Sequence, residues 1–199
     1  MIGPMYREQG GARTSRHRAG AGFTLIESMT VVAILAIGLA IAVPNLRDFL
    51  VKNKVAGLSN EFSGALLQAR AWAVSKNSCV TLCTASVSAS TSPVCSTTQT
   101  DYQQGWIIFR NSACDTTQTT PGSGNLLAAR MGESNGYQIH PLGTGLNSIT
   151  FDPRGTAALS AQGIFQVLAP GSASTFNRNV CIDVSGRSSV RKYDASSCI

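Results

Sequence analysis

Six cysteines carry the most distinctive chemistry of this sequence, and all of them lie after residue 78. They are Cys79, Cys83, Cys95, Cys114, Cys181 and Cys198. Cysteine thiolates bind zinc when four ligands converge, but the close pair Cys79 and Cys83 has no second pair to complete such a site. The chain also has only two histidines, His17 and His140. An even number of cysteines is typical of disulfides in an oxidising compartment, so we expect disulfides and no metal.

The pairing of these cysteines is open, because six cysteines allow 15 connectivities. In one of these connectivities, Cys83–Cys95 would close a polar loop and Cys181–Cys198 would tie the carboxyl-terminal tail to a strand. The remaining pair, Cys79–Cys114, would join two neighbouring strands. Closing loops of this size stabilises a fold by about 2–4 kcal/mol each. We therefore interpret the cysteines as staples of a loop-rich domain.

The sequence shows no catalytic constellation. His140 is the only histidine after residue 22, and it precedes Pro141 in a turn-like stretch. The acidic residues are scattered singly. The glycines of Gly122-Ser-Gly124 neither follow a strand nor open a helix, as those of a phosphate-binding loop would. The sequence therefore predicts that the protein is not an enzyme and needs no cofactor.

A group of cations near the carboxyl end is the one candidate for ligand binding. Its members are Arg178, Arg187, Arg191 and Lys192. Cations presented from neighbouring strand ends could contact phosphates without reading base sequence. The same charges would equally protect a sheet edge from pairing, and both interpretations stay open. The formal net charge of +6 adds little, since residues 1–22 contribute +3 of it.

A single carboxylate, Glu27, interrupts the longest apolar run, residues 23–43. A charge at the bilayer centre costs about 2.5–3.5 kcal/mol, and less near an interface, so we expect Glu27 to have a partner and not merely to reach the headgroups. The run would form a helix of about 31 Å, enough to cross a hydrocarbon core. Pro44 is expected to end or kink this helix. The basic residues before it place the amino terminus in the cytoplasm and the rest outside.

Residues 44–77 continue the helical pattern, now with one apolar face. The apolar positions are Leu46, Phe49, Leu50, Val55, Leu58, Phe62, Leu66, Ala69 and Ala73. From residue 78 the period becomes two. We expect strands at 79–84, 106–110, 126–131, 148–152, 163–168, 180–184 and 189–193. The predicted fold class is α+β, a long helix packed on an antiparallel sheet, with residues 78–199 as the disulfide-stapled domain.

The string Gly22-Phe23-Thr24-Leu25-Ile26-Glu27 resembles the processing site of type IV pilins and type II secretion pseudopilins. In that family a prepilin peptidase cleaves after the glycine and methylates the new amino terminus. The resemblance implies a leader of residues 1–22, methylation of Phe23, and a filament charge pair between Glu27 and the α-amino group of Phe23. It also implies a single-pass inner-membrane anchor with a periplasmic domain, which later enters the pilus.

Three segments of the β-rich part resemble the FimT/FimU minor pilins and the GspH pseudopilin. They are Trp106-Ile-Ile-Phe, Ile149-Thr-Phe-Asp-Pro-Arg-Gly155 and Cys181-Ile-Asp-Val-Ser-Gly-Arg187. The resemblance implies a minor pilin that helps to initiate or cap the pilus, with major and minor pilins as partners. The alternatives are a GspH-type secretion pseudopilin, or a minor pilin whose carboxyl-terminal cations bind double-stranded DNA in natural transformation. For the latter, the spacing after Gly186 departs from the tight Gly-Arg-x-Arg pattern.

Overall fold

The computed structural model describes residues 22–86, 93–98, 100–133, 135–171, 174–194 and 196–198. The expected leader therefore lies outside the described residues, apart from Gly22. The chain divides into two compact units, Met1–Val43 and Pro44–Ile199. One helix, α1 (Leu25–Ser75), contributes its first part to one unit and its second part to the other.

Local hydrogen bonds set both ends of α1. At its start the Thr24 hydroxyl accepts a hydrogen bond from the N–H of Glu27 at 3.3 Å. Thr24 thus caps the helix, with Glu27 as the acidic residue three positions on. At its end Asn77 has a φ of 47°, and the N–H of Ser78 donates to the carbonyl of Ala73 at 3.2 Å. A left-handed residue with this backward hydrogen bond is a common helix stop.

The helix continues through Pro44, in agreement with the helical pattern expected for residues 44–77, because proline removes only one backbone donor and the sequence on both sides supports helix. Of the two effects expected of Pro44, ending the helix does not occur. The expected burial of the first apolar positions after Pro44 is wrong. Leu46, Phe49 and Leu50 are 56%, 58% and 57% exposed instead of buried. Their spacing does put them on an apolar face, but contacts with the core begin only at Val51. The rest of the expected stripe is buried, from Val55 to Ala73.

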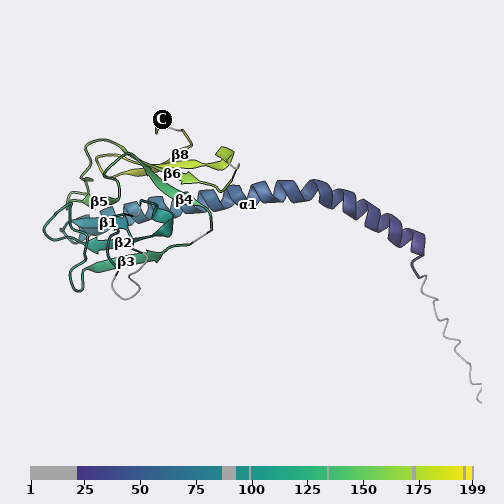
Figure 1. The fold of residues 1–199 in the computed structure, drawn as a ribbon, viewed down its shortest axis with the longest axis horizontal. Helices are drawn as coiled ribbons and strands as arrows, with labels where there is room; N and C mark the ends of the chain where they lie inside the picture. Colours follow the sequence, from purple (N-terminus) through teal and green to yellow (C-terminus); the bar gives the residue numbers. More distant parts are fainter. Residues whose placement is uncertain are drawn as a thin grey trace, which may run out of the picture. The chain divides into compact units, whose positions relative to one another are not determined.

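The described residues of the second unit form two four-stranded antiparallel sheets around the later part of α1, where a single sheet was expected (Figure 1). The first sheet has the order β3-β2-β1-β5 and the second β4-β6-β7-β8. The strands are β1 (Val80–Thr84), β2 (Gly105–Arg110), β3 (Leu126–Met131), β4 (Gln138–Leu142), β5 (Ser148–Phe151), β6 (Gly163–Leu168), β7 (Arg178–Ile182) and β8 (Ser188–Lys192). Two short 3-10 helices, η1 (Tyr102–Gln104) and η2 (Ser174–Phe176), precede β2 and β7.

The strand β4 was not expected, and it corrects the interpretation of His140 and Pro141 as a turn. His140 lies opposite Gln166 and Pro141 opposite Phe165, both on β6. Proline is tolerated here because β4 is an edge strand, where not every N–H is needed for pairing. The burial of β4 alternates, with Ile139 and Pro141 buried and His140 exposed.

The core is centred on Phe62, which α1 inserts between the two sheets. Its ring centroid lies 4.9 Å from that of Tyr102, 5.0 Å from that of Phe165 on β6 and 5.5 Å from that of Trp106 on β2. Tyr102 is fully buried, and its hydroxyl donates to the carbonyl of Leu146 at 2.6 Å. Burial raises the pKa of Tyr102 well above its usual value. One helix thus holds both sheets through a single aromatic cluster.

Three disulfides cross-link this unit. Of the 15 possible connectivities, the structure has the one spelled out in the sequence analysis. The pairs are Cys79–Cys114, Cys83–Cys95 and Cys181–Cys198, with Cα–Cα distances of 5.2, 5.6 and 6.1 Å. Because every cysteine is paired, none is left as a thiolate ligand for a metal ion.

Candidate functional site

The first candidate site is the start of the apolar helix. Residues 22–24 lie outside α1, and Phe23 is 83% exposed. The peptide bond between Gly22 and Phe23 therefore lies in exposed, non-helical backbone. Peptidases cut most readily at such places, so the geometry leaves this bond accessible.

Glu27 occupies the first turn of α1. A carboxylate there interacts favourably with the positive end of the helix dipole, by about 0.3–1 kcal/mol at an exposed site. Within the described ranges no Lys or Arg forms an ion pair with Glu27. A cationic partner for this carboxylate would have to come from outside these ranges or from another molecule.

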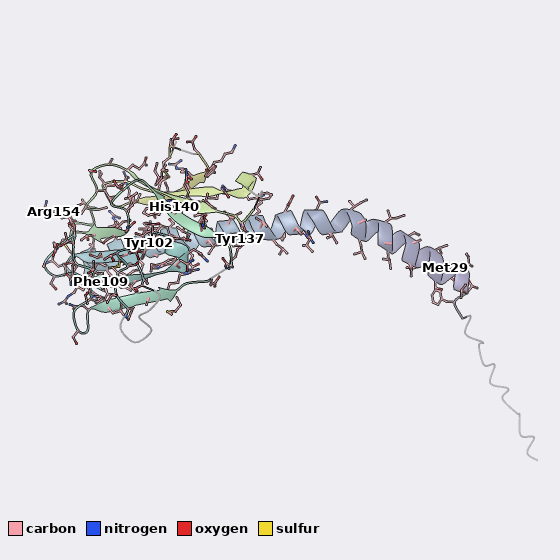
Figure 2. The ribbon with its side chains drawn as sticks, viewed as in Figure 1. Met29, Tyr102, Phe109, Tyr137, His140 and Arg154 are labelled. Carbon is pink, nitrogen blue, oxygen red and sulfur yellow. A yellow bond between two sulfur atoms is a disulfide. The ribbon has the colours of Figure 1, made fainter. Side chains whose placement is uncertain are left out.

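The first part of α1 presents apolar side chains in every direction, Met29 among them (Figure 2). Its large hydrophobic residues from Leu25 to Val43 are all exposed. A window of α1 has a mean hydropathy of 2.3, so this helix is long and apolar enough to cross a membrane. An isolated helix that is apolar all round needs lipid or other helices to cover it.

The second candidate site, the carboxyl-terminal cations, does not form one patch. Arg191 and Lys192 are consecutive in β8, so their side chains leave opposite faces of the sheet. Lys192 lies opposite Arg178, and Arg191 lies opposite Asn179. The Arg178 face is the one that buries Val180 in the core, so only Arg178 and Lys192 share it.

Arg187 is separate again, because it lies in the turn between β7 and β8. Its Nε donates to Asp183 Oδ2 at 3.2 Å and to Ser185 Oγ at 3.0 Å. The Ser185 hydroxyl and the Arg187 backbone N–H also donate to Asp183 Oδ1, at 2.6 and 2.9 Å. Hydrogen bonding, from Ser185 first, lowers the pKa of Asp183. Arg187 is therefore part of a closed turn.

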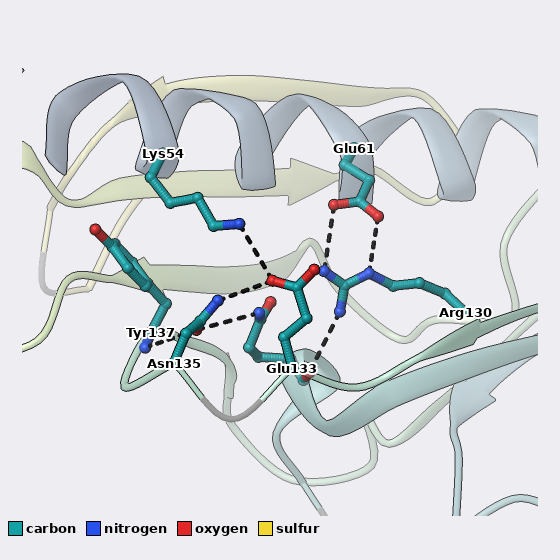
Figure 3. A network of polar contacts seen from close by, with 7 residues as sticks. Lys54, Glu61, Arg130, Glu133, Asn135 and Tyr137 are labelled. Atoms are coloured by element: carbon teal, nitrogen blue, oxygen red, sulfur yellow. Dashed lines mark hydrogen bonds and ion pairs between the residues drawn. The ribbon is translucent and has the colours of Figure 1, made fainter. Parts of the chain in front are cut away.

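A polar network that the sequence did not reveal joins α1 to β3 and the segment after it (Figure 3). Lys54 donates to Glu133 Oε2 at 3.1 Å, and Arg130 donates to Glu61 Oε1 at 2.8 Å. The hydrogen bond from Lys54 lowers the pKa of Glu133. Glu61 and Arg130 are 69 residues apart, so no local spacing signals the pair. We assign this network to holding the helix on the first sheet.

No group of three His, Cys, Asp or Glu side chains converges in the described part of the chain. His140 lies alone on the exposed side of β4.

Comparison with known proteins identifies the two parts of the chain separately. The family described as type II transport protein GspH matches residues 58–186, which is more than half of the chain. The prokaryotic N-terminal methylation motif matches residues 17–43. No curated protein sequence matches the chain.

Two solved structures share the fold, both of the type IV minor pilin FimU from Pseudomonas aeruginosa. One has a TM-score of 0.52 and 16% identity, and it covers 72% of this chain and 99% of its own. The other, from a second crystal form, has a TM-score of 0.51 and 18% identity, with coverage of 75% and 95%. At these identities the likeness establishes the fold alone. The family match, the methylation motif and this fold together show that the chain is a type IV pilin-like protein and belongs to the GspH family.

Proposed function

We propose that this protein is a minor type IV pilin of the FimT/FimU type, which helps to initiate or cap the pilus filament. One observation carries the proposal: a methylation motif at residues 17–43 is joined by one helix, Leu25–Ser75, to a GspH-family match at residues 58–186 with the fold of a minor pilin. Such a chain is built to be processed at its amino terminus and then packed by its helix among others.

Processing would occur at the exposed bond between Gly22 and Phe23. A prepilin peptidase would remove residues 1–22, and the methylated α-amino group of Phe23 would become the amino terminus. The mature chain would remain in the inner membrane through residues 23–43, with its domain in the periplasm, until the filament takes it up. The exposed apolar surface of this helix supports the proposal, because neighbouring pilin helices would replace lipid around it.

Glu27 would select the position of the incoming subunit. Its carboxylate has no ion-pair partner among the described residues, and the α-amino group of Phe23 on a neighbouring subunit is the expected counter-ion. An ion pair of this kind offsets desolvation only when its geometry is good, so a subunit in the wrong register is disfavoured.

A GspH-type pseudopilin of type II secretion is the second candidate, and the description of the matching family favours it. The third candidate, a DNA-binding minor pilin, is less well supported. Arg191 and Lys192 leave opposite faces of β8, and Arg187 is bound to Asp183. These cations therefore offer no single track for a duplex.

The decisive experiment compares the unaltered chain with the variant Glu27→Val. Both are expressed in a strain that has the prepilin peptidase and the filament-assembly proteins with which this chain works. Mass spectrometry of the amino terminus should show cleavage after Gly22 and methylation of Phe23 in both proteins. Sheared filaments should contain the unaltered chain in low amount and lack the variant. Asp48→Asn, a change at an exposed carboxylate in the unit Pro44–Ile199, is the control and should be incorporated.

Deleting the gene in the same strain separates the minor pilin from the secretion pseudopilin. Loss of pili after deletion of the gene supports the minor pilin. Intact pili with impaired protein secretion would support the pseudopilin. Incorporation of the Glu27 variant at the unaltered level would contradict the role of this carboxylate.

A further inference from the structure

A hollow of about 370 Å³ lies beside α1 at the end of the second sheet, and the proposed function makes no use of it. Its lining comes from α1, from η2 and the residue after it, and from β7 and β8. The lining residues are Lys52, Thr175, Phe176, Asn177, Arg178 and Lys192. Three of these six are cations, and none is acidic.

The three cations lie on the faces of α1 and of the sheet that bury the core elsewhere. Lys52 precedes the buried Val55 by three residues, so both lie on one face of the helix. Arg178 and Lys192 are directly opposite each other and share the sheet face of Val180. Where apolar side chains would continue the packing, helix and sheet instead present like charges to the same hollow.

The three like charges repel one another, with solvent screening the two exposed lysines in part. Like charges directly opposite each other on antiparallel strands destabilise the pair, and Arg178 and Lys192 are such a pair. In the described part of the chain, none of the three cations forms an ion pair. The contrast with Arg187 is plain, since that residue binds Asp183.

Neutral donors add to the lining. Asn177 is 7% exposed, and its Oδ1 accepts a hydrogen bond from the N–H of Ala169 at 2.8 Å. The other end of the same amide is an NH₂ group, which can only donate. Thr175 contributes a hydroxyl. An acceptor-only ligand with several oxygens fits this set of groups.

We propose that the hollow binds one phosphate group, either free or carried by the headgroup of an anionic lipid. Arg and Lys together with a neutral amide are suitable ligands for a tetrahedral oxyanion, and charge-assisted hydrogen bonds are about twice as strong as neutral ones. A compact hollow with three cations suits one such group, whereas a nucleic-acid duplex needs a row of contacts. The lipid source rests on the proposed function, because only a membrane-anchored chain meets headgroups. The free-phosphate source does not.

The test uses the full chain in a maltoside detergent, which contains no phosphate. Titration calorimetry with inorganic phosphate is performed against sodium chloride of equal ionic strength. The hollow is altered by the triple variant Lys52→Gln, Arg178→Gln and Lys192→Gln. The matched control changes three exposed cations elsewhere and removes the same charge: Lys76→Gln, Arg110→Gln and Arg191→Gln.

We expect saturable binding by the unaltered chain and by the control, and a loss of at least about tenfold in affinity in the hollow variant, which corresponds to roughly 1.4 kcal/mol. Phosphate should also raise the thermal midpoint of the unaltered chain and of the control but not that of the hollow variant. Without phosphate the hollow variant should be at least as stable as the unaltered chain, because a repulsion has been removed.

A second series with the soluble lipid dihexanoyl phosphatidylglycerol identifies the source of the phosphate. Tighter binding of this lipid than of inorganic phosphate assigns the hollow to headgroups, and the reverse assigns it to the free ion. Equal affinities for phosphate in the hollow variant and the control would overturn the proposal. The proposal would also be overturned if neither phosphate nor lipid binds, while a short DNA duplex binds the unaltered chain and not the hollow variant. Phosphate binding by a chain that never enters filaments would leave this inference standing and remove the proposed function.

Discussion

Arg130 is stacked on Trp106, with its Cζ atom 4.6 Å from the centroid of the indole ring. The same guanidinium contacts Glu61 through its Nε at 2.8 Å, so a single side chain of β3 links β2 to α1. The Arg130 side chain is only 16% exposed, but Glu61 is 44% exposed. Solvent therefore weakens the ion pair, and the stacking on Trp106 adds a second contribution of similar size, about 0.5–1 kcal/mol.

Arg130→Ala is expected to lower the free energy of unfolding by about 1–2 kcal/mol, from the lost stacking and ion pair together. Urea denaturation of the full chain in maltoside, followed by tryptophan fluorescence, measures the change. Arg110→Ala is the control, since Arg110 is an exposed arginine on β2, and it should alter stability by less than about 0.5 kcal/mol. Equal losses in the two variants would contradict the role of the stacking.

Phe62→Ala should be far more damaging than Phe49→Ala, although both residues lie on α1. Phe62 is fully buried between the sheets and Phe49 is 58% exposed. Removing a buried phenylalanine costs about 3–5 kcal/mol, so the first variant is expected to lower the unfolding free energy by that amount. The second should change it by less than about 0.5 kcal/mol. A large effect of Phe49→Ala in the isolated chain would show that something in the same molecule covers it.

Sequence periodicity predicted where the elements lie better than it predicted what covers them. The bounds of β3 and β6 agree with the expected strands, because turn residues flank both apolar runs. The strand β4 was missed because Pro141 suggested a turn, and only the position of β4 at a sheet edge makes the proline acceptable. Phe49 has the spacing of a core residue, but spacing does not tell whether the covering surface belongs to the same chain.

The candidate sites were predictable to different degrees. The processing site is a contiguous string, so the sequence contains all of it. The cations near the carboxyl end are also close in sequence, but strand alternation separates Arg191 from Lys192. Lys52 lies more than a hundred residues before Arg178, and no local pattern predicts that both line one hollow. Sites assembled from distant segments require the register, which only the structure supplies.

Removing the disulfide Cys79–Cys114 should destabilise the protein more than removing Cys83–Cys95. The two bridges span 35 and 12 residues. In the chain-entropy account the longer loop contributes roughly 1 kcal/mol more, on a base of about 3 kcal/mol each. Double Cys→Ala variants keep the sites apolar, and urea denaturation compares them. Cys181–Cys198, which spans 17 residues, provides a third variant that should fall between the two. The reverse order would mean that packing around the buried Cys83 outweighs the loop length.

The turn between β7 and β8 should make part of the stability depend on acid. The Ser185 hydroxyl, followed by the backbone N–H of Arg187, lowers the pKa of Asp183 in the folded state, whereas an unfolded aspartate has a pKa of about 3.9. A lowered folded pKa stabilises the protein at pH values above the unfolded pKa, and this contribution disappears as the pH falls through the folded value.

Asp183→Ala should therefore lower the thermal midpoint near neutral pH. The gap between the variant and the unaltered chain should then narrow as the pH is taken from about 5 down to about 2. Asp48→Ala, a change at an exposed carboxylate on α1, is the control and should show a much smaller gap across the range. Ser185→Ala should reproduce part of the effect, because it removes the hydrogen bond that shifts the pKa most. A gap for Asp183→Ala that stays constant down to the lowest pH would mean that the carboxylate acts through the shape of the turn and not through its charge.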